Sequence, residues 1–429
     1  MRLAISTLGC KTNSYESAAI ASAFPEGWEL VDFSTAADVY IVNTCTVTGR
    51  TDFKSRNLIR KALARKAQDP SVKVVVTGCF AQRHPLEVAE LGEVDLIVDN
   101  QSKADIWDLL NGSANHFRDA SEATSFRYAP VTAMLDRSRA FQKVQDGCGL
   151  FCAYCAVSHA RGPSRSARLT DVLAQARLFV RSAYREIVLG GVNLGLYRDG
   201  ETDLTDLLGE MKQIEGLELI RLSSLEPQLV TQRLLEELAS GSIYCPHLHL
   251  SLQSGSETVL KRMGRRYGAE DFERLVAQIV TRIPQVAIGA DVIVGFPGET
   301  DTEFAETRRL VESLPFAYLH VFSYSKRPGT PAAAMPDQIP SFVKKERSNI
   351  LLNISGRKTA DYQKHLLDEH VTLRGVVESV HSGVATMLSD HFVRAYTKDR
   401  VEPGSVVAVI PTHIHSDGLM GDLARGNKN

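Results

Sequence analysis

Cys148-Gly149-Leu150-Phe151-Cys152-Ala153-Tyr154-Cys155 places three cysteines within eight residues, with the spacing Cys-x3-Cys-x2-Cys. Three thiolates can hold a [4Fe–4S] cluster and leave one iron without a protein ligand, so that this iron can bind a small molecule. A structural zinc site usually has four protein ligands, and His159 is the one further candidate close to this segment. The spacing therefore favours an iron–sulfur site over a zinc site.

The segment follows the first of six apolar runs that alternate with helical patterns, which predicts a partial (β/α)6 barrel. Strands are expected near residues 141–146, 186–190, 218–223, 247–252, 286–295 and 317–323. Helices are expected over residues 169–182, 205–212, 227–239, 269–282 and 301–313. In such a barrel the functional site lies at the carboxyl ends of the strands, where the three cysteines are expected.

Residues 1–110 also alternate between apolar runs and helical patterns, which predicts a doubly wound parallel sheet. Cys10, Cys45 and Cys79 each come shortly after an expected strand. Because the carboxyl ends of parallel strands share one edge of the sheet, these three cysteines can converge on one point. The alternative is that they are buried apolar side chains. Cys245 matches neither group, and we expect it to be a core or surface thiol.

A long basic helix over residues 342–367 is expected at the end of the central part. Short alternating strands follow, which predicts a small antiparallel β-barrel. The fold class is therefore α/β and multidomain. The expected parts are an N-terminal domain (1–112), a linker (113–136), a central barrel (137–366) and a C-terminal barrel (367–429).

The composition is that of a folded, non-membrane protein. The chain has 429 residues, of which 44% are hydrophobic, and a formal net charge of -2. No apolar run approaches the roughly 18 residues of a membrane span, and no secretory signal is evident. We therefore expect a cytoplasmic protein with reduced thiols and no membrane partner.

The barrel cysteines, together with Tyr154, resemble the signature of the radical S-adenosylmethionine (radical-SAM) superfamily. Further segments resemble the methylthiotransferase branch of that superfamily, which ends in a TRAM-like barrel. These segments are Thr7-Leu8-Gly9-Cys10-Lys11-Thr12-Asn13, Asn43-Thr44-Cys45-Thr46-Val47-Thr48, Thr77-Gly78-Cys79, Arg161-Gly162-Pro163-x-Arg165-Ser166, Leu222 to Pro227, Leu252 to Ser256 and Val294 to Thr300.

The resemblance implies two [4Fe–4S] clusters and S-adenosylmethionine as cofactors. Cys148, Cys152 and Cys155 would hold the cluster that binds S-adenosylmethionine. Cys10, Cys45 and Cys79 would hold a second cluster and the sulfur to be transferred. The implied reaction adds a methylthio group at C2 of an adenine, whose hydrogen is not acidic and must be removed by a radical.

The first cysteine segment, extended through Tyr15-Glu16-Ser17, is similar to that of enzymes acting on N6-threonylcarbamoyladenosine at tRNA position 37. The alternatives are isopentenyladenosine in tRNA, an aspartate of a ribosomal protein, or a noncatalytic iron–sulfur sensor that binds RNA. The expected partners are the anticodon loop of tRNA, a reduced electron donor such as flavodoxin or ferredoxin, and a sulfur donor.

The resemblance also implies residues that contact S-adenosylmethionine, although glycine turns and strand-end caps would explain them equally well. These residues are Tyr154, Gly190, Gly191, Val192, Ser223, Ser224, Glu226, Gln253, Val294 and Gly295. For RNA, the basic run Lys261, Arg262, Arg265 and Arg266 is the expected phosphate-binding patch. The basic helix that begins near Lys344 and stacking on Phe392 or Tyr396 are alternatives.

Overall fold

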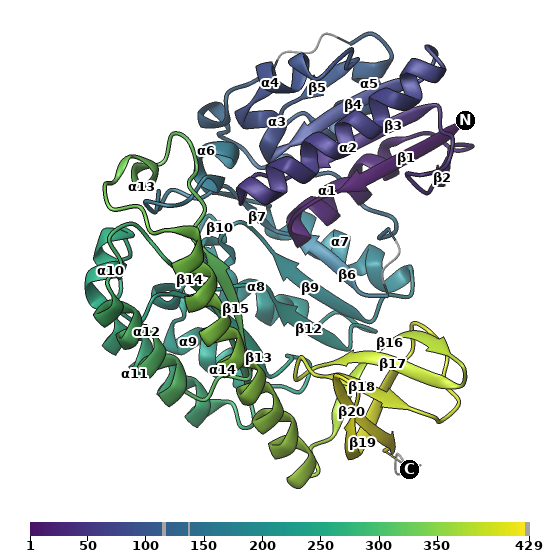
Figure 1. Ribbon diagram of the computed structural model, residues 1–429. Helices are drawn as coiled ribbons and strands as arrows, with labels where there is room; N and C mark the ends of the chain where they lie inside the picture. Colours follow the sequence, from purple (N-terminus) through teal and green to yellow (C-terminus); the bar gives the residue numbers. More distant parts are fainter. Residues whose placement is uncertain (114–116, 136–137, 425–429) are drawn as a thin grey trace.

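The computed structural model describes residues 1–113, 117–135 and 138–424. In Figure 1 the N-terminal sheet and the C-terminal barrel lie at opposite ends, with the central strands and helices between them. Within the described part of the chain, no helix is long and apolar enough to cross a membrane. Part of the expected linker, residues 114–116 and 136, lies outside the described residues, as do residues 425–429 of the C-terminal part.

The N-terminal part contains the expected parallel sheet, with strand order β2-β1-β3-β4-β5. Its strands are β1 (Arg2–Thr7), β2 (Glu29–Val31), β3 (Val39–Thr44), β4 (Lys73–Gly78) and β5 (Leu96–Val98). The central strand β3 is buried along its whole length, as its uninterrupted apolar run predicts. The edge strand β2 was not predicted, because three partly exposed residues give no clear period.

Helices follow the strands of this sheet. They are α1 (Lys11–Ala23), α2 (Gly49–Gln68), α3 (Cys79–Arg83), α4 (Pro85–Glu90) and α5 (Ile106–Leu110), with the 3-10 turn η1 (Lys103–Asp105). A capping box between Thr48 and Thr51 starts α2. Helix α1 packs against the central part, since Tyr15, Ala18 and Ala19 belong to the central hydrophobic core.

The central part contains six parallel strands in two three-stranded sheets, β12-β9-β6 and β13-β14-β15. The strands are β6 (Ala140–Lys143), β9 (Glu186–Gly190), β12 (Leu219–Leu222), β13 (His247–Gln253), β14 (Ala287–Val294) and β15 (Tyr318–Ser323). Isolated parallel bridges at Ile220–Tyr244 and Leu225–Leu250 connect the two sheets. Their number and direction agree with the expected six βα units.

Five longer helices connect these strands. They are α7 (Leu169–Arg181), α8 (Leu204–Met211), α9 (Gln232–Ala239), α11 (Ala269–Arg282) and α12 (Asp301–Ser313). The shorter elements are α6 (Val157–Arg161), α10 (Glu257–Arg262), α13 (Pro331–Ala334), β7 (Gln145–Asp146), β8 (Arg165–Ser166), β10 (Arg198–Asp199), β11 (Thr202–Asp203), η2 (Ala120–Glu122), η3 (Leu194–Leu196) and η4 (Pro227–Leu229). Helix α14 (Ser341–Asp368) packs along β15 and leads into the C-terminal part, close to the predicted bounds.

The C-terminal part is a closed five-stranded barrel with the order β16-β17-β18-β20-β19. Its strands are β16 (Leu373–His381), β17 (Val384–Ser389), β18 (Arg394–Thr397), β19 (Val406–His415) and β20 (Gly418–Leu423). The expectation of a wholly antiparallel barrel was wrong, because β18 and β20 pair in parallel. A closed ring with an odd number of strands must contain at least one parallel pair. The prediction missed β20, and with it the odd number.

Candidate active site between the two cysteine triads

The barrel triad lies on the loop between β7 and α6, just beyond the carboxyl end of β6. Two side chains donate hydrogen bonds to its sulfurs. Arg265 Nη1 lies 3.2 Å from Cys152 Sγ, and Asn193 Nδ2 lies 3.9 Å from Cys148 Sγ. Because the ligand form of cysteine is the thiolate, such donors favour the state that binds iron.

Burial and hydrogen bonding act in opposite directions on this triad. Burial raises the pKa of Cys152, and the Arg265 guanidinium opposes this effect. Burial also raises the pKa of Cys155, whose sulfur accepts backbone N–H groups from Ser158 and Val157. A bound metal would supply the remaining stabilisation of these thiolates, with release of their protons.

The N-terminal triad lies at the carboxyl edge of the N-terminal sheet. Cys10 precedes α1, Cys45 follows β3, and Cys79 begins α3. Burial raises the pKa of Cys45 to about 12, and the nearby Cys79 and Cys10 add to this effect. Gly9 has φ +99°, and a Cβ atom there would lie 2.7 Å from Cys45 Sγ, so glycine permits the close approach of these two segments.

In neither triad do all three sulfurs lie within 4.8 Å of one another. Among the described residues, only His249, Asp291 and His320 form a set of three His, Cys, Asp or Glu ligand atoms within 4.8 Å of one another. Zinc–sulfur bonds of about 2.3 Å would require the sulfurs of a triad to be closer than this limit. A four-iron cluster holds its thiolates further apart, and all six cysteines are free of disulfide bonds.

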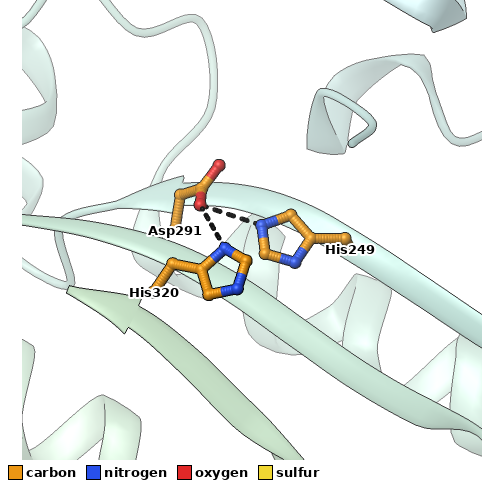
Figure 2. A group of neighbouring side chains, drawn as sticks. All are labelled: His249, Asp291 and His320. Carbon is orange, nitrogen blue, oxygen red and sulfur yellow. Dashed lines mark ion pairs between the residues drawn. The ribbon is translucent and has the colours of Figure 1, made fainter. Parts of the chain in front are cut away.

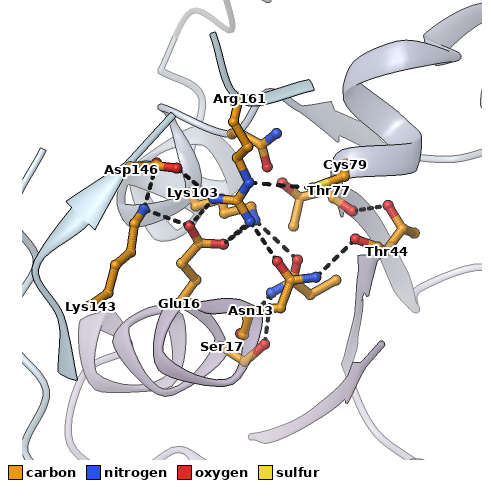
Figure 3. Close-up of polar contacts among 12 residues, drawn as sticks. Asn13, Glu16, Ser17, Thr44, Thr77, Cys79, Lys103, Lys143, Asp146 and Arg161 are labelled. Atoms are coloured by element: carbon orange, nitrogen blue, oxygen red, sulfur yellow. Dashed lines mark hydrogen bonds and ion pairs between the residues drawn. The ribbon is translucent and has the colours of Figure 1, made fainter. Parts of the chain in front are cut away.

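Arg161, at the end of α6 in the segment after the barrel triad, connects the central part to Cys79 of the N-terminal triad through a buried network (Figure 3). Its Nε lies 3.3 Å from Cys79 Sγ, and its Nη2 lies 2.6 Å from Asn13 Oδ1. It also forms an ion pair with Glu16. Asn13 in turn donates to the carbonyl oxygens of Leu8 and Thr44, which fixes the first two cysteine segments against each other.

Glu16 is the acidic centre of this network. Its carboxylate pairs with Lys103 of the N-terminal part and with Lys143 and Arg161 of the central part. Burial alone would raise the pKa of Glu16, but these three cations outweigh burial and hold the pKa well below its ordinary value. Glu16 is therefore ionised, and its ion pairs hold the two parts of the chain together at the cysteine edge.

A second connection lies on the other side of the triads. The buried Arg327, from the loop after β15, donates to Thr46 Oγ1 at 2.9 Å and pairs with Asp52. Gly49 N also donates to Ser325 Oγ at 3.0 Å. Arg83 lies in the fields of both Cys79 and Cys155, although burial is the largest influence and lowers its pKa.

A cavity of about 210 Å³ lies beside the second of these connections, since Ser325 is one of its lining residues. Val47 and Thr48 form its N-terminal wall, beside Cys45 in sequence. Tyr154, Cys155 and Gln253 lie on the central wall, together with Asp291 of β14 and Tyr324, which directly follows β15. The cavity thus adjoins both cysteine segments and is mostly apolar elsewhere.

Several residues expected to contact S-adenosylmethionine gather near the barrel triad. Glu226 forms an ion pair with Arg265, which also reaches Tyr154 Oη at 3.4 Å. Gln253 ends β13 at a β-bulge with φ +65° and faces the cavity. Burial raises the pKa of Glu226, against the opposing charge of Arg265.

The glycine and serine residues of this set are placed at strand ends. Gly190 ends β9 next to Ser223, whose buried Oγ lacks a hydrogen-bond partner in the described structure. A Cβ atom on Gly191 would lie 2.7 Å from Gln145 Oε1, so this glycine packs against the strand that leads to Cys148. Val192 is half-buried beside these glycines, and Ser224 is exposed.

Val294 ends β14 and Gly295 follows it, and neither residue lines the cavity. The Val294 side chain is buried, and its carbonyl accepts from Tyr324 N at 2.8 Å. Gly295 has φ +70° and packs against the stem of Lys344 on α14.

The structure corrects the expected phosphate-binding patch. The Arg265 side chain is only 2% exposed, because it turns inward to Cys152 and Glu226. Arg262 makes a bidentate ion pair with Glu303. Lys261 and Arg266 are exposed and are the members still available to a phosphate.

Sequence analysis missed a polar layer inside the central sheets. His249 Nε2 lies 2.9 Å and His320 Nδ1 lies 3.4 Å from Asp291 Oδ1, on three adjacent strands (Figure 2). These hydrogen bonds and charges outweigh the effect of burial, which alone would raise the pKa, and hold the pKa of Asp291 at about 2. Polar residues at alternate positions, His247 and His249, were the available signal of an inward-facing polar row.

Two family models match the chain. A family described as "Uncharacterized protein family UPF0004" matches residues 2–99, and the Radical SAM superfamily matches residues 143–311. Among solved structures, the radical S-adenosylmethionine methyltransferase TsrM from Kitasatospora setae, with cobalamin and a [4Fe-4S] cluster bound, has a TM-score of 0.59 and 15% identity, covering 77% of each chain. This likeness concerns the fold alone.

Curated relatives match almost the whole chain. Threonylcarbamoyladenosine tRNA methylthiotransferase MtaB of Bacillus subtilis is 40% identical over 377 residues, covering 86% of this chain and 83% of the relative. Its namesake in Aquifex aeolicus is 37% identical over 423 residues, covering 96% and 100%. The tRNA-2-methylthio-N(6)-dimethylallyladenosine synthase of Cereibacter sphaeroides is 32% identical over 428 residues, covering 98% of each. With two triads at one interface and this extent of similarity, the chain belongs to the threonylcarbamoyladenosine tRNA methylthiotransferase family of radical-SAM proteins.

Proposed function

We propose that this protein adds a methylthio group at C2 of N6-threonylcarbamoyladenosine at tRNA position 37. The observation that carries the proposal is the convergence of two cysteine triads, from two different parts of the chain, on one interface. Arg161 bonds to Cys79 from the segment that follows Cys155, and one cavity adjoins Thr48 and Cys155. A reaction that joins sulfur to an adenine carbon needs a radical source and a sulfur carrier close together.

Each triad would hold one [4Fe–4S] cluster through its three thiolates, and the barrel cluster would bind S-adenosylmethionine. When bound, the barrel cluster supplies the electron that cleaves S-adenosylmethionine reductively. Arg265 and Asn193 hold the barrel sulfurs in place through N–H donation. Arg161 does the same for Cys79. The apolar walls of the cavity exclude water from the reacting atoms.

The residues expected to contact S-adenosylmethionine keep that role in the proposal. Tyr154, Glu226 and Gln253 are supported by their positions beside the barrel triad. Gly190, Gly191, Val192, Ser223 and Ser224 are supported by their place at the carboxyl ends of β9 and β12. Val294 and Gly295 are supported only by the resemblance of their segment.

The proposal extends to organisation and partners. The two three-stranded sheets form one partial barrel (137–366), between the methylthiotransferase domain (1–112), the linker (113–136) and a TRAM-like domain (367–429). A flavodoxin- or ferredoxin-type reductant supplies electrons, a separate donor supplies sulfur, and the protein acts in the cytoplasm.

The test separates the two triads. Anaerobically reconstituted protein is expected to bind about eight iron atoms per chain, four on each triad. A variant with Cys10, Cys45 and Cys79 replaced by Ala should keep half of the iron and still cleave S-adenosylmethionine to 5′-deoxyadenosine. It should make no methylthiolated nucleoside, as measured by mass spectrometry of digested tRNA.

The matched variant, with Cys148, Cys152 and Cys155 replaced by Ala, should keep the other half of the iron and perform neither reaction. Full iron retention in either variant would contradict the ligand assignment. Loss of cleavage in both folded variants would contradict separate roles for the triads. If wild-type protein leaves N6-threonylcarbamoyladenosine in tRNA unmodified, this result contradicts the proposed substrate.

A further inference from the structure

A second cavity, of about 250 Å³, lies where the three parts of the chain meet, and we call it the three-part pocket. Cys10 and Lys11 line it from the N-terminal part, Arg139 and Arg221 from the central part, and Leu388 and Phe392 from the C-terminal part. It therefore begins beside a cysteine of the N-terminal triad. Nothing in the proposed chemistry described above uses it.

Three cationic side chains line the pocket, and two of them are paired with carboxylates. Arg221 is satisfied by Glu186 at 2.8 Å and by the carbonyl oxygen of Ser389 at 2.9 Å. Arg139 pairs with Glu378 at 2.7 Å. Across the described residues, by contrast, Lys11 forms no ion pair, and the charges of Arg221 and Arg139 act on it more strongly than that of Glu186.

The backbone adds to this positive character. The pocket faces the first turn of α1, a 13-residue helix, through Cys10, Lys11 and Ser14. The side chain of Cys10 makes no capping hydrogen bond at this helix end. The backbone N–H groups of the first turn and the helix dipole therefore favour an anion at the same place as Lys11.

One wall of the pocket is aromatic and rigid. The Phe392 ring stacks on His247, with ring centroids 4.2 Å apart and an interplanar angle of 16°, and also on Tyr318 at 4.9 Å. The Arg221 guanidinium lies over the same ring at 5.7 Å. A ligand that fits these surfaces carries an anionic group on an otherwise uncharged body.

We propose that the three-part pocket receives the carboxylate of the N6-threonylcarbamoyl group, with Lys11 as its charge partner. The inference rests on the proposed function. The threonyl moiety ends in a carboxylate, whereas the dimethylallyl substituent of the related substrate has no charge. Because Lys11 is bonded directly to Cys10, a substituent held there keeps the adenine beside the N-terminal triad. Lys11 is thus a specificity-determining residue, and Arg221 and Arg139 set the field around it.

The test measures binding rather than turnover. The ligands are anticodon stem-loop RNAs with N6-threonylcarbamoyladenosine, its neutral carboxamide or plain adenosine at position 37. Wild-type holoprotein should bind the carboxylate RNA about 10- to 100-fold more tightly than the carboxamide RNA. Lys11→Gln should abolish this difference without changing the affinity for the other two RNAs, and Lys11→Arg should keep most of it. Lys54→Gln, at an exposed lysine of α2, is the matched control.

Three results would overturn the assignment. Equal binding of the three RNAs by wild-type protein would show that the carboxylate is not recognised. An equal loss for all three RNAs in Lys11→Gln would assign Lys11 to a backbone phosphate. A difference that persists in Lys11→Gln would place recognition elsewhere.

The experiments distinguish a failure of the proposed function from a failure of the proposed carboxylate site. Lys11→Gln should retain iron and reductive cleavage of S-adenosylmethionine, which reports that both triads are intact. If wild-type protein prefers the carboxylate RNA but does not methylthiolate it, carboxylate recognition is supported and the proposed reaction is contradicted. If Lys11→Gln loses iron, the wild-type comparison of carboxylate and carboxamide still decides the question.

Discussion

Arg161 is a single side chain on which the relative position of the two triads depends. It is fully buried, comes from the segment after Cys155, and contacts Asn13, Glu16 and Cys79 of the N-terminal part. Removing one member of a buried ion pair leaves the partner charge unsatisfied, which is far more costly than losing an exposed pair.

Arg161→Ala is therefore expected to lower the free energy of unfolding by about 3–5 kcal/mol, as measured by urea denaturation. It should also reduce iron binding by the N-terminal triad more than by the barrel triad. Arg168→Ala is the matched control, since Arg168 pairs with Asp171 in solvent and is 75% exposed, so its loss should cost far less than that of Arg161. Equal costs for the two variants would contradict the bridging role of Arg161.

At the scale of elements, α10 and α12 are joined by the bidentate pair of Arg262 and Glu303. Glu303 also forms the capping box of α12 with Thr300. The hydrogen bonds from Arg262 are the largest influence and lower the pKa of Glu303 from 4.5 to about 2. A depressed pKa stabilises the folded chain above the unfolded-state pKa, and this contribution is lost as the pH falls toward 2.

Glu303→Gln should thus cost about 1–3 kcal/mol of unfolding free energy at pH 7. The difference from wild type should shrink steadily between pH 4.5 and pH 2, where Glu303 becomes protonated in wild type as well. Glu270→Gln, on the exposed first turn of α11, should show neither the cost nor the pH dependence. A Glu303→Gln effect that is constant down to pH 2 would rule out ionisation as its cause.

The sequence allowed positions to be predicted where residues close together in the chain determine the local structure. The positions of Cys10, Cys45 and Cys79 were predicted because each follows its own strand, and parallel strands end at one edge. Arg265 was misassigned because its partner, Glu226, lies 39 residues earlier. The local reason is Gly264, whose φ of +75° turns the chain after α10 and sends Arg265 inward while Arg266 stays exposed.

The same limit applies to the first cysteine segment. Tyr15, Glu16 and Ser17 supported the choice of substrate by resemblance, yet all three are buried. Tyr15 bonds to the carbonyl oxygen of Ala129, and Glu16 pairs with Lys103. Only the folded structure separates these packing residues from Lys11, which faces the three-part pocket.

At the scale of the whole molecule, the net charge of -2 leaves tRNA binding to local patches. Lys261 and Arg266 are the exposed members of the predicted patch. If both contact phosphates, replacing them with Gln should reduce the slope of log affinity against log salt by about 0.7–0.9 per contact. S-adenosylmethionine cleavage should be unchanged, because neither residue lines the cavity between the triads.

The control for this measurement replaces Arg274 and Arg308, which are 63% and 50% exposed on other helices. An unchanged slope in the Lys261/Arg266 variant would reject this patch. The same slope change in the control variant would show that general charge, rather than a specific patch, binds tRNA.

The ion pairs of Arg161 and Arg327 also determine when, during translation, the N-terminal part can complete its contacts. Residues 1–112 leave the ribosome long before Arg327 has been translated. While the N-terminal part first folds, Asp52 therefore lacks its ion pair with Arg327. Glu16 has Lys103 beside it at that stage but lacks Lys143 and Arg161. The N-terminal sheet can therefore form early in translation. The contacts that fix its cysteine edge are completed only when the last third of the chain is translated.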